Sequence, residues 1–243
     1  MSDWATITSL VLPKQGHTDA ECEDAVAVRE TGTALQLAMA DGATEAAYSR
    51  RWAQALVEAG VALEAKARIA EAVDRARASF EATTAQQKAG LPWYAEQKAQ
   101  EGAFATLLRL RVRLMIDRSL GIGGSWEGEA VGDVTLFHLQ AGDPIWIWPN
   151  DDPNSFGSRP ALVASNSDLD PDTVERFAAT WRPGDVLLVT TDALAAYLLA
   201  EEAALRRLVH TSQNAWSDFV DHARADGMRN DDVALVRIDL HGP

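Results

Sequence analysis

Four aspartates stand at the boundaries of apolar segments, although long stretches of chain separate them. They are Asp24, Asp41, Asp192 and Asp231. The largely apolar segments 34–40 and 185–191 are typical of buried strands, and each is followed at once by one of these acids. If the strand ends meet, repulsion and desolvation would raise the pKa values of the four carboxyl groups unless cations were bound. Because carboxylate oxygens suit Mg²⁺ and Mn²⁺, the sequence predicts a fold that brings these strand ends together around divalent cations.

Several other segments have the periodicity of strands. In residues 108–114, apolar side chains alternate with Arg109, Arg111 and Arg113, so one face of the strand is apolar and the other is basic. A turn is expected at the glycine-rich segment 121–124, which lacks the lysine and the spacing of a phosphate-binding loop. Further strands are expected at residues 129–140, 144–148 and 233–240.

Helical patterns are interleaved with these strands. The alanine-rich segment 45–80 carries apolar residues at helical spacing and predicts one or two long helices, with a break near Gly60. Further helices are expected at residues 93–100, 172–181, 201–209 and 216–225. Strands and helices do not alternate as regularly as in a doubly wound parallel sheet. We therefore expect an α+β fold with mixed or antiparallel sheets flanked by helices.

Composition restricts the domain count and the partners. The chain has 243 residues, of which 47% are hydrophobic, so we expect one core and a single domain spanning residues 1–243. Asp and Glu number 36 against 22 Lys and Arg, which gives a formal net charge of −14. This excess of negative charge disfavours nucleic acids and anionic membranes as partners. A substrate that carries phosphate would need local positive charge, which bound cations could supply.

The cysteine count and the hydropathy pattern indicate an intracellular protein. Cys22 is the only cysteine, which excludes an intrachain disulfide and a zinc site made of thiolates, and we expect it to be a small packing residue. Residues 1–13 lack a basic region followed by an apolar one, and no segment approaches the roughly 18 consecutive apolar residues of a membrane span. We therefore expect a cytoplasmic protein.

Five short motifs occur in order along nearly the whole chain. They are Glu23-Asp24-Ala25, Asp41-Gly42, Val131-Gly132-Asp133, Thr191-Asp192-Ala193 and Asp231-Asp232-Val233-Ala234-Leu235-Val236. Each motif alone is weak, since Asp-Gly is a common turn signal. Together they resemble the metal-dependent protein phosphatase (PPM) family, of the protein phosphatase 2C type. The segments 16–17, 22–24 and 41–44 are further similar to a bacterial subgroup of this family.

The resemblance implies an α/β/β/α four-layer sandwich with two mainly antiparallel sheets and a metal centre between them at one end. It implies two Mg²⁺ or Mn²⁺ ions, with a third ion bound more weakly. The implied metal-binding residues are Asp41, Gly42, Asp192, Asp231, Glu23 and Asp133. Within this set Asp41 bridges the two ions, Gly42 binds through its carbonyl group, and Asp133 binds the third ion.

The reaction implied by this resemblance is hydrolysis of phosphoserine or phosphothreonine by a water activated at the two-metal centre, so a phosphorylated protein is the expected partner. Two neighbouring cations can lower the pKa of a water molecule and neutralise phosphoryl charge without a covalent intermediate. The sequence accordingly has no Cys-x5-Arg motif around Cys22 and no Gly-x-Ser-x-Gly motif. The implied catalytic residues are Asp24, which with Glu23 holds metal-bound water, and His17. His17 is either a phosphate ligand or general acid, or an exposed loop residue.

Two positions depart from the family pattern. Many relatives carry an arginine that binds substrate phosphate five residues before the equivalent of Asp24, where this chain has Asp19. A histidine that follows Asp-Gly in some relatives is replaced by Ala43. The alternative function is therefore a catalytically weak or inactive regulatory or binding module, and hydrolysis of a small phosphorylated metabolite is a third possibility.

Structural roles compete with these functional ones. Aspartates at strand ends often form turns or caps, and Glu23 and Asp133 could serve as hydrogen-bonding or solvated charges. The arginine row in residues 109–113 favours pairing with acids on neighbouring strands over binding an anionic substrate. We expect Trp146 and Trp148 to lie on a half-buried face of a sheet; the alternative is that they form a platform for a peptide substrate.

Overall fold

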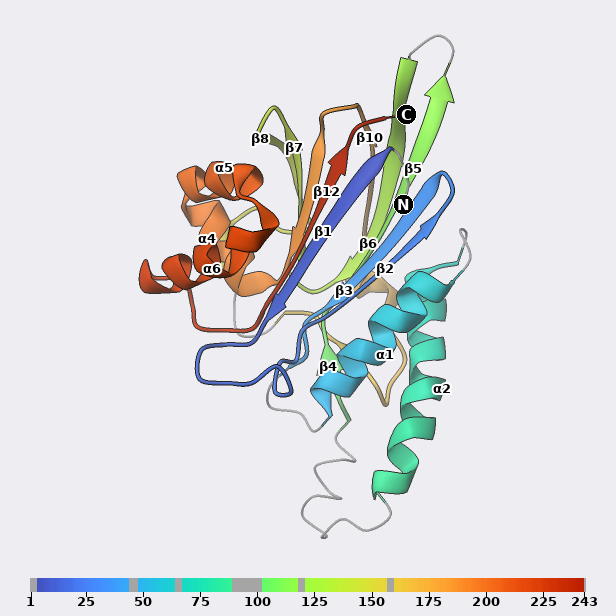
Figure 1. The fold of residues 1–243 in the computed structure, drawn as a ribbon. Helices are drawn as coiled ribbons and strands as arrows, with labels where there is room; N and C mark the ends of the chain where they lie inside the picture. Colours follow the sequence, from blue (N-terminus) through green and yellow to red (C-terminus); the bar gives the residue numbers. More distant parts are fainter. Residues whose placement is uncertain are drawn as a thin grey trace.

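Two five-stranded antiparallel sheets lie face to face at the centre of the fold (Figure 1). The computed structural model describes residues 4–43, 48–63, 67–88, 102–117, 121–156 and 160–242. The first sheet, in spatial order, contains β1 (Ala5–Leu12), β12 (Val233–Leu240), β11 (Val186–Thr190), β7 (Thr135–Gln140) and β8 (Asp143–Trp148). The second sheet contains β10 (Glu175–Trp181), β6 (Gly121–Val131), β5 (Leu107–Asp117), β3 (Ala34–Ala40) and β2 (Ala25–Thr31). A short additional sheet pairs β4 (Phe104–Ala105) with β9 (Val163–Ala164).

Helices cover the outer face of each sheet. The helices α1 (Ser49–Ala62) and α2 (Ile69–Lys88) lie on the second sheet, and α4 (Asp192–Ala200), α5 (Glu202–His210) and α6 (Trp216–Ala225) lie on the first (Figure 1). Short 3₁₀ turns occur at Pro153–Ser155, Pro171–Thr173 and Gln213–Ala215. The expected α+β class and the α/β/β/α sandwich are therefore confirmed. None of the helices in the described ranges is long and apolar enough to cross a membrane.

Successive side chains of each strand point to opposite faces of its sheet, and this alternation lets one strand pack against layers on both sides. Leu37 and Leu110 of the second sheet belong to the same core cluster as Val236 of the first, and burial of each such side chain stabilises the fold by about 1.5–3 kcal/mol. The neighbouring residue Ala38 faces the other way, toward α1. A Cβ atom on Gly60 would lie 2.8 Å from the Ala38 Cβ atom, so this glycine lets α1 approach the sheet closely. Gly60 itself lies inside α1, and the expected break near it falls just afterwards, because α1 ends at Ala62 and α2 begins at Ile69.

Most of the expected strands and helices are present. Those expected at residues 34–40, 108–114, 144–148, 185–191, 201–209, 216–225 and 233–240 correspond to β3, β5, β8, β11, α5, α6 and β12. The helix expected at residues 93–100 lies outside the described residues. The strands β1, β4 and β9 and the helix α4 were not anticipated, and β2 was expected only as a segment that begins after Asp24.

The helix expected at residues 172–181 is wrong, because this segment forms a 3₁₀ turn followed by the strand β10. Phe177 and Trp181 are four residues apart, which suits one face of a helix and also one face of a strand. The segment is a strand because it pairs with β6, with Glu175 opposite Ala130 and Trp181 opposite Gly124.

The turn expected at residues 121–124 is also wrong, because these glycines begin β6. A Cβ atom on Gly124 would overlap the indole ring of Trp181, so glycine is needed there for packing between neighbouring strands. The single strand expected at residues 129–140 is divided into β6 and β7. The division falls at Gly132, whose φ of +98° is a backbone conformation that favours glycine.

Candidate metal centre

The strand registers place six aspartates at one end of the sandwich. In the second sheet Ala25 pairs with Ala40, so Asp24 and Asp41 lie just beyond the paired ends of β2 and β3. In the first sheet, Thr190 pairs with both Thr135 and Leu235. The residues just beyond those ends are Asp133, Asp192, Asp231 and Asp232. The convergence of strand ends expected from the sequence is thus present in both sheets.

Asp24 connects the two sheets through Thr191. The Thr191 hydroxyl group donates a hydrogen bond to Asp24 Oδ2 at 2.9 Å and accepts one from the Ala234 backbone N–H at 3.0 Å. The carboxylate of Asp24 is buried, and its Oδ1 atom has no hydrogen-bond partner among the described residues. A buried carboxylate oxygen without a donor is costly, which makes Oδ1 a ready acceptor for a cation or a proton.

Asp232 holds the loop between β1 and β2 against β12. Its Oδ1 atom accepts a hydrogen bond from the Lys14 N–H at 2.8 Å, and its Oδ2 atom accepts one from the Glu23 N–H at 2.7 Å. Both carboxylate oxygens are therefore committed to backbone groups. The sequence indicated an acidic pair at the start of this strand, but it did not distinguish this anchoring role from that of Asp231.

Asp41 and Gly42 are held by an edge contact with the short strand β4. The Thr106 N–H donates to the Asp41 carbonyl oxygen at 2.9 Å, and Gly42 forms an isolated bridge with Ala105. A Cβ atom on Gly42 would lie 3.1 Å from both the Cβ and the carbonyl oxygen of Glu23. The absence of a side chain at Gly42 therefore lets the half-buried Glu23 pack close beside Asp41.

Burial and mutual repulsion disfavour ionisation of these carboxyl groups. Burial raises the pKa of Asp41 well above its usual range, and the charges of Asp24, Asp192 and Asp133 raise it further. Burial likewise raises the pKa of Asp24, although its hydrogen bond from Thr191 offsets part of the increase. Burial and the charge of Asp192 raise the pKa of Asp133 to about 7. Positive charge placed among these carboxyl groups, as divalent cations would supply it, would favour their ionised forms.

Arg229 supplies part of that positive charge. Its guanidinium group is hydrogen-bonded to Asp192, and its Nε atom lies 3.2 Å from Asp231 Oδ2. Burial lowers the pKa of Arg229, but the hydrogen bond and charge of Asp192 outweigh that effect and leave it raised. This role of Arg229 was not predicted from the sequence. Its position two residues before Asp231 was the only available signal.

The donor set fits hard divalent cations, although the side chains are not arranged as a finished cage. In the described part of the chain, no three or more His, Cys, Asp or Glu side chains are placed so that they could hold one ion as they stand. Arg229 accounts for this arrangement at Asp192 and Asp231, because it bonds to both. The remaining features favour Mg²⁺ or Mn²⁺: all the donors are oxygens, the carboxyl groups repel one another, and Asp24 Oδ1 is buried without a donor.

The other candidate residues lie around this centre. His17 and Asp19 are exposed in the β1–β2 loop, and His17 lowers the pKa of Glu21 after the larger effect of hydrogen bonds from Thr18. Cys22 is buried, and burial raises the pKa of its thiol to about 12, in line with a packing role. Ala43 pairs with Phe104 through its backbone N–H, while residues 44–47 lie outside the described ranges.

Comparison with known proteins identifies the fold. No protein-family model and no curated protein sequence matches the chain. Among solved structures, the chain is similar to the serine/threonine phosphatase PstP/Ppp of Mycobacterium tuberculosis, with a TM-score of 0.60, 17% identity, and coverage of 98% of this chain and 99% of that one.

Two further structures were solved with metal ions. The catalytic domain of PstP in complex with two manganese ions matches with a TM-score of 0.59 and 18% identity, covering 98% of this chain and 99% of that one. RsbX in complex with magnesium matches with a TM-score of 0.56 and 15% identity, covering 99% of this chain and 97% of that one. The chain thus has the fold of the metal-dependent serine/threonine phosphatases, and the resemblance seen in the sequence is confirmed at the level of the fold.

Proposed function

We propose that this protein is a Mg²⁺- or Mn²⁺-dependent phosphatase that hydrolyses phosphoserine or phosphothreonine in proteins, with residues 1–243 acting as one domain. The observation that carries this proposal is the convergence of five mutually repelling aspartates at the end of a phosphatase-type sandwich. In this proposal Asp41, Asp192 and Asp231 bind two cations together with the carbonyl group of Gly42. Glu23 contributes to the same site, and Asp133 holds a third cation.

Bound cations would lower the pKa of a water molecule and neutralise charge on the phosphoryl oxygens. The chain's own residues position the reactants around them. Thr191 fixes the orientation of Asp24, so the Oδ1 atom of Asp24 is available to accept a proton from the attacking water. Hydrolysis forms a bond between the water oxygen and phosphorus, breaks the ester bond to the serine or threonine oxygen, and returns a proton to that oxygen.

His17 is the candidate donor of that proton. It is exposed on the loop that Asp232 fastens beside Glu23, so it can meet a substrate from the solvent side.

Arg229 is our candidate for the phosphate-binding group that Asp19 does not provide. Cations that bind Asp192 and Asp231 would release its guanidinium group, which is about half exposed. A guanidinium group forms paired hydrogen bonds with phosphate oxygens. Arg229 would then exchange a protein carboxylate for the substrate phosphate when the metal centre forms.

The second candidate function is a regulatory or binding module without turnover. Two observations favour it: Asp19 stands in place of the usual arginine, and Arg229 already neutralises Asp192 and Asp231. In such a module the fold would be retained while Arg229 took the place of the cations.

The deciding experiment is a Mn²⁺ titration of turnover on a small aryl phosphate and on a phosphoserine peptide. A phosphatase shows turnover that rises with Mn²⁺ and is lost in Asp41→Asn and Asp192→Asn. Absence of turnover at every Mn²⁺ or Mg²⁺ concentration would favour the binding module. A large preference for a small phosphorylated metabolite over the peptide would instead indicate a metabolite phosphatase.

A further inference from the structure

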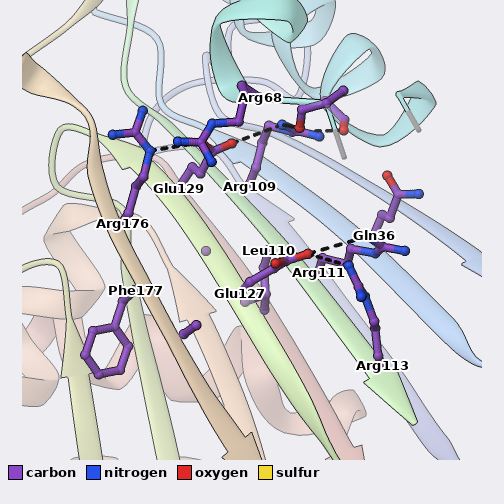
Figure 2. Close-up of a pocket in the computed structure, with 14 residues that line it drawn as sticks. Gln36, Arg68, Arg109, Leu110, Arg111, Arg113, Glu127, Glu129, Arg176 and Phe177 are labelled. Atoms are coloured by element: carbon purple, nitrogen blue, oxygen red, sulfur yellow. Dashed lines mark hydrogen bonds and ion pairs between the residues drawn. The ribbon is translucent and has the colours of Figure 1, made fainter. Parts of the chain in front are cut away.

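A basic groove lies on the outer face of the second sheet, beside α1 and α2 (Figure 2). Its volume is about 550 Å³. Five arginines and two glutamates supply its charged lining, namely Arg68, Arg109, Arg111, Arg113, Arg176, Glu127 and Glu129. The strands β5 and β6 project beyond the two helices in Figure 1, so the helical layer covers only part of this face. The groove is therefore separate from the metal centre, which lies at the end of the sandwich.

Three of the arginines share a single carboxylate. Arg109 and Arg176 stand on either side of Glu129 in the strand register, and their guanidinium groups lie 3.3 and 3.2 Å from it. Arg68, which precedes α2, lies 3.4 Å from the same carboxylate. Glu129 also accepts a hydrogen bond from the Ile69 N–H at 2.7 Å, so part of its acceptor capacity is used at the start of α2.

The other two arginines share the second carboxylate. Glu127 lies 3.5 Å from Arg111 and 2.8 Å from Arg113. The outer neighbours of this pair of strands contribute no charge here: Ala178 of β10 pairs with Glu127 of β6, and Gln36 of β3 pairs with Arg111 of β5. The pairing with acids expected for this arginine row is thus confirmed. Two carboxylates nevertheless face five guanidinium groups, which leaves an excess of positive charge in the groove.

The arginines on the floor of the groove are less exposed than those on its rim. The side chains of Arg109 and Arg111 are only 12% and 18% exposed, whereas those of Arg113 and Arg176 on the rim are 42% and 43% exposed. Burial lowers the pKa of Arg109 and of Arg111, and the charge of Arg113 lowers that of Arg111 further. Partly desolvated cations of like charge are stabilised when an anion joins them. The groove therefore has the opposite charge to the rest of this acidic chain.

We propose that this groove binds an acidic segment of a protein partner in an extended conformation. Arg109, Arg111 and Arg113 are alternate residues of one strand, so their α-carbons are spaced at about 6.6–6.8 Å. Alternate side chains of an extended peptide have the same spacing, and the guanidinium group matches a carboxylate with paired hydrogen bonds. The positive charge is local and surrounded by a chain of net charge −14, which suits a short acidic segment better than a long nucleic acid.

The groove would act as a docking site away from the chemistry. Gln36, which pairs with Arg111, lies five residues before Asp41 on β3, a separation of roughly 17 Å along the strand. An acidic segment bound there would not compete for the metal centre. Binding at the groove is thus independent of whether the centre proves to be active.

The test is fluorescence anisotropy with a labelled peptide in which glutamate and serine alternate. The double variant Arg113→Ala with Arg176→Ala removes two rim charges that are both exposed, and we expect binding about fivefold weaker or more. Glu127→Gln removes a competing carboxylate, and we expect tighter binding. Arg206→Ala is the matched control, because Arg206 is an exposed arginine on α5 that also bonds to two acids, Asp143 and Glu202.

Several results would overturn the inference. Failure of the wild-type protein to bind the peptide at low ionic strength is one, and an equal loss of affinity in Arg206→Ala is another, since it would reflect total charge alone. Single-stranded DNA that displaces the peptide at a lower concentration than unlabelled peptide would identify the groove as a nucleic-acid site instead. Thermal melts of all variants show whether each one is folded, and Glu127→Gln tests the groove by a gain of affinity that unfolding cannot produce.

Discussion

The guanidinium group of Arg229 is hydrogen-bonded to the carboxylate of Asp192, the residue that begins α4 just beyond the end of β11. The same guanidinium group also bridges to Asp231 at the start of β12. One arginine thus neutralises two of the carboxylates that we assign to divalent cations. Arg229 and the cations would compete for these oxygens.

Replacing Arg229 tests this competition. In Arg229→Gln we expect the metal-free protein to lose about 1 kcal/mol of stability, because a half-exposed ion pair is removed and two carboxylates lose their counter-charge. Mn²⁺ should bind more tightly than in the wild-type protein, because its competitor is gone. Thermal melts across a Mn²⁺ series measure both effects, with Arg206→Gln as the control. Unchanged melts with and without metal would show that Arg229 does not compete with metal.

Replacement of Asp41 is expected to raise the stability of the metal-free protein and to lower its activity. Asp41→Asn removes a carboxylate that four other aspartates repel, so the metal-free protein should become more stable near neutral pH. Stabilisation by Mn²⁺ should disappear, and turnover should fall at least about 100-fold. The exposed residue Asp143 offers a matched control as Asp143→Asn. A destabilised Asp41→Asn that still responds to Mn²⁺ would contradict this assignment.

The stability of the metal-free protein should fall as the pH rises from about 4 to about 7. Asp133, whose pKa is raised to about 7, binds more protons in the folded chain than in the unfolded chain over this range. Each such carboxyl group contributes a decrease of about 1.4 kcal/mol per pH unit between its unfolded and folded pKa values. Asp24 and Asp41 act in the same direction.

Urea unfolding at several pH values measures this slope. Asp133→Asn should make the slope shallower, and saturating Mn²⁺ should flatten it because the cations favour the ionised carboxylates. A metal-free stability that rises steadily across this pH range would show that the carboxyl groups are not crowded in the folded chain.

Asp232 should matter for folding in every metal condition. Its two oxygens accept hydrogen bonds from the backbone of Lys14 and Glu23, and loss of both in Asp232→Ala should cost about 2–4 kcal/mol. Asp232→Asn retains one acceptor oxygen and should be intermediate. Mn²⁺ should raise the melting temperature of both variants as it does in the wild-type protein. Loss of the Mn²⁺ response in a folded Asp232→Asn would instead make Asp232 a metal ligand.

The sequence predicted the parts of the fold in which local patterns and tertiary packing agree. The row in residues 108–114 alternates strictly, so β5 was found together with the acid pairing of its basic face. Phe177 and Trp181 satisfy both a helical and an extended spacing, and only pairing with β6 decides between them. The helix α4 is apolar almost throughout and has no polar face to mark it.

The candidate centre was predicted as a set of acids but not as an arrangement. Position at strand ends was enough to select Asp24, Asp41, Asp192 and Asp231. The partners of Asp232 lie 218 and 209 positions away in the chain, so its anchoring role has no local signal. Arg229 was missed for the same reason, since its bond to Asp192 depends on the pairing of β11 with β12.

A crystal structure of the protein grown with Mn²⁺, with anomalous difference density recorded, tests the central claim most directly. We expect anomalous peaks bounded by Asp41, Asp192 and Asp231, with the guanidinium group of Arg229 displaced from Asp192. Crystals at saturating Mn²⁺ that show no peak among these carboxylates, with Arg229 still bonded to Asp192, would contradict the metal centre and the hydrolysis proposed for it.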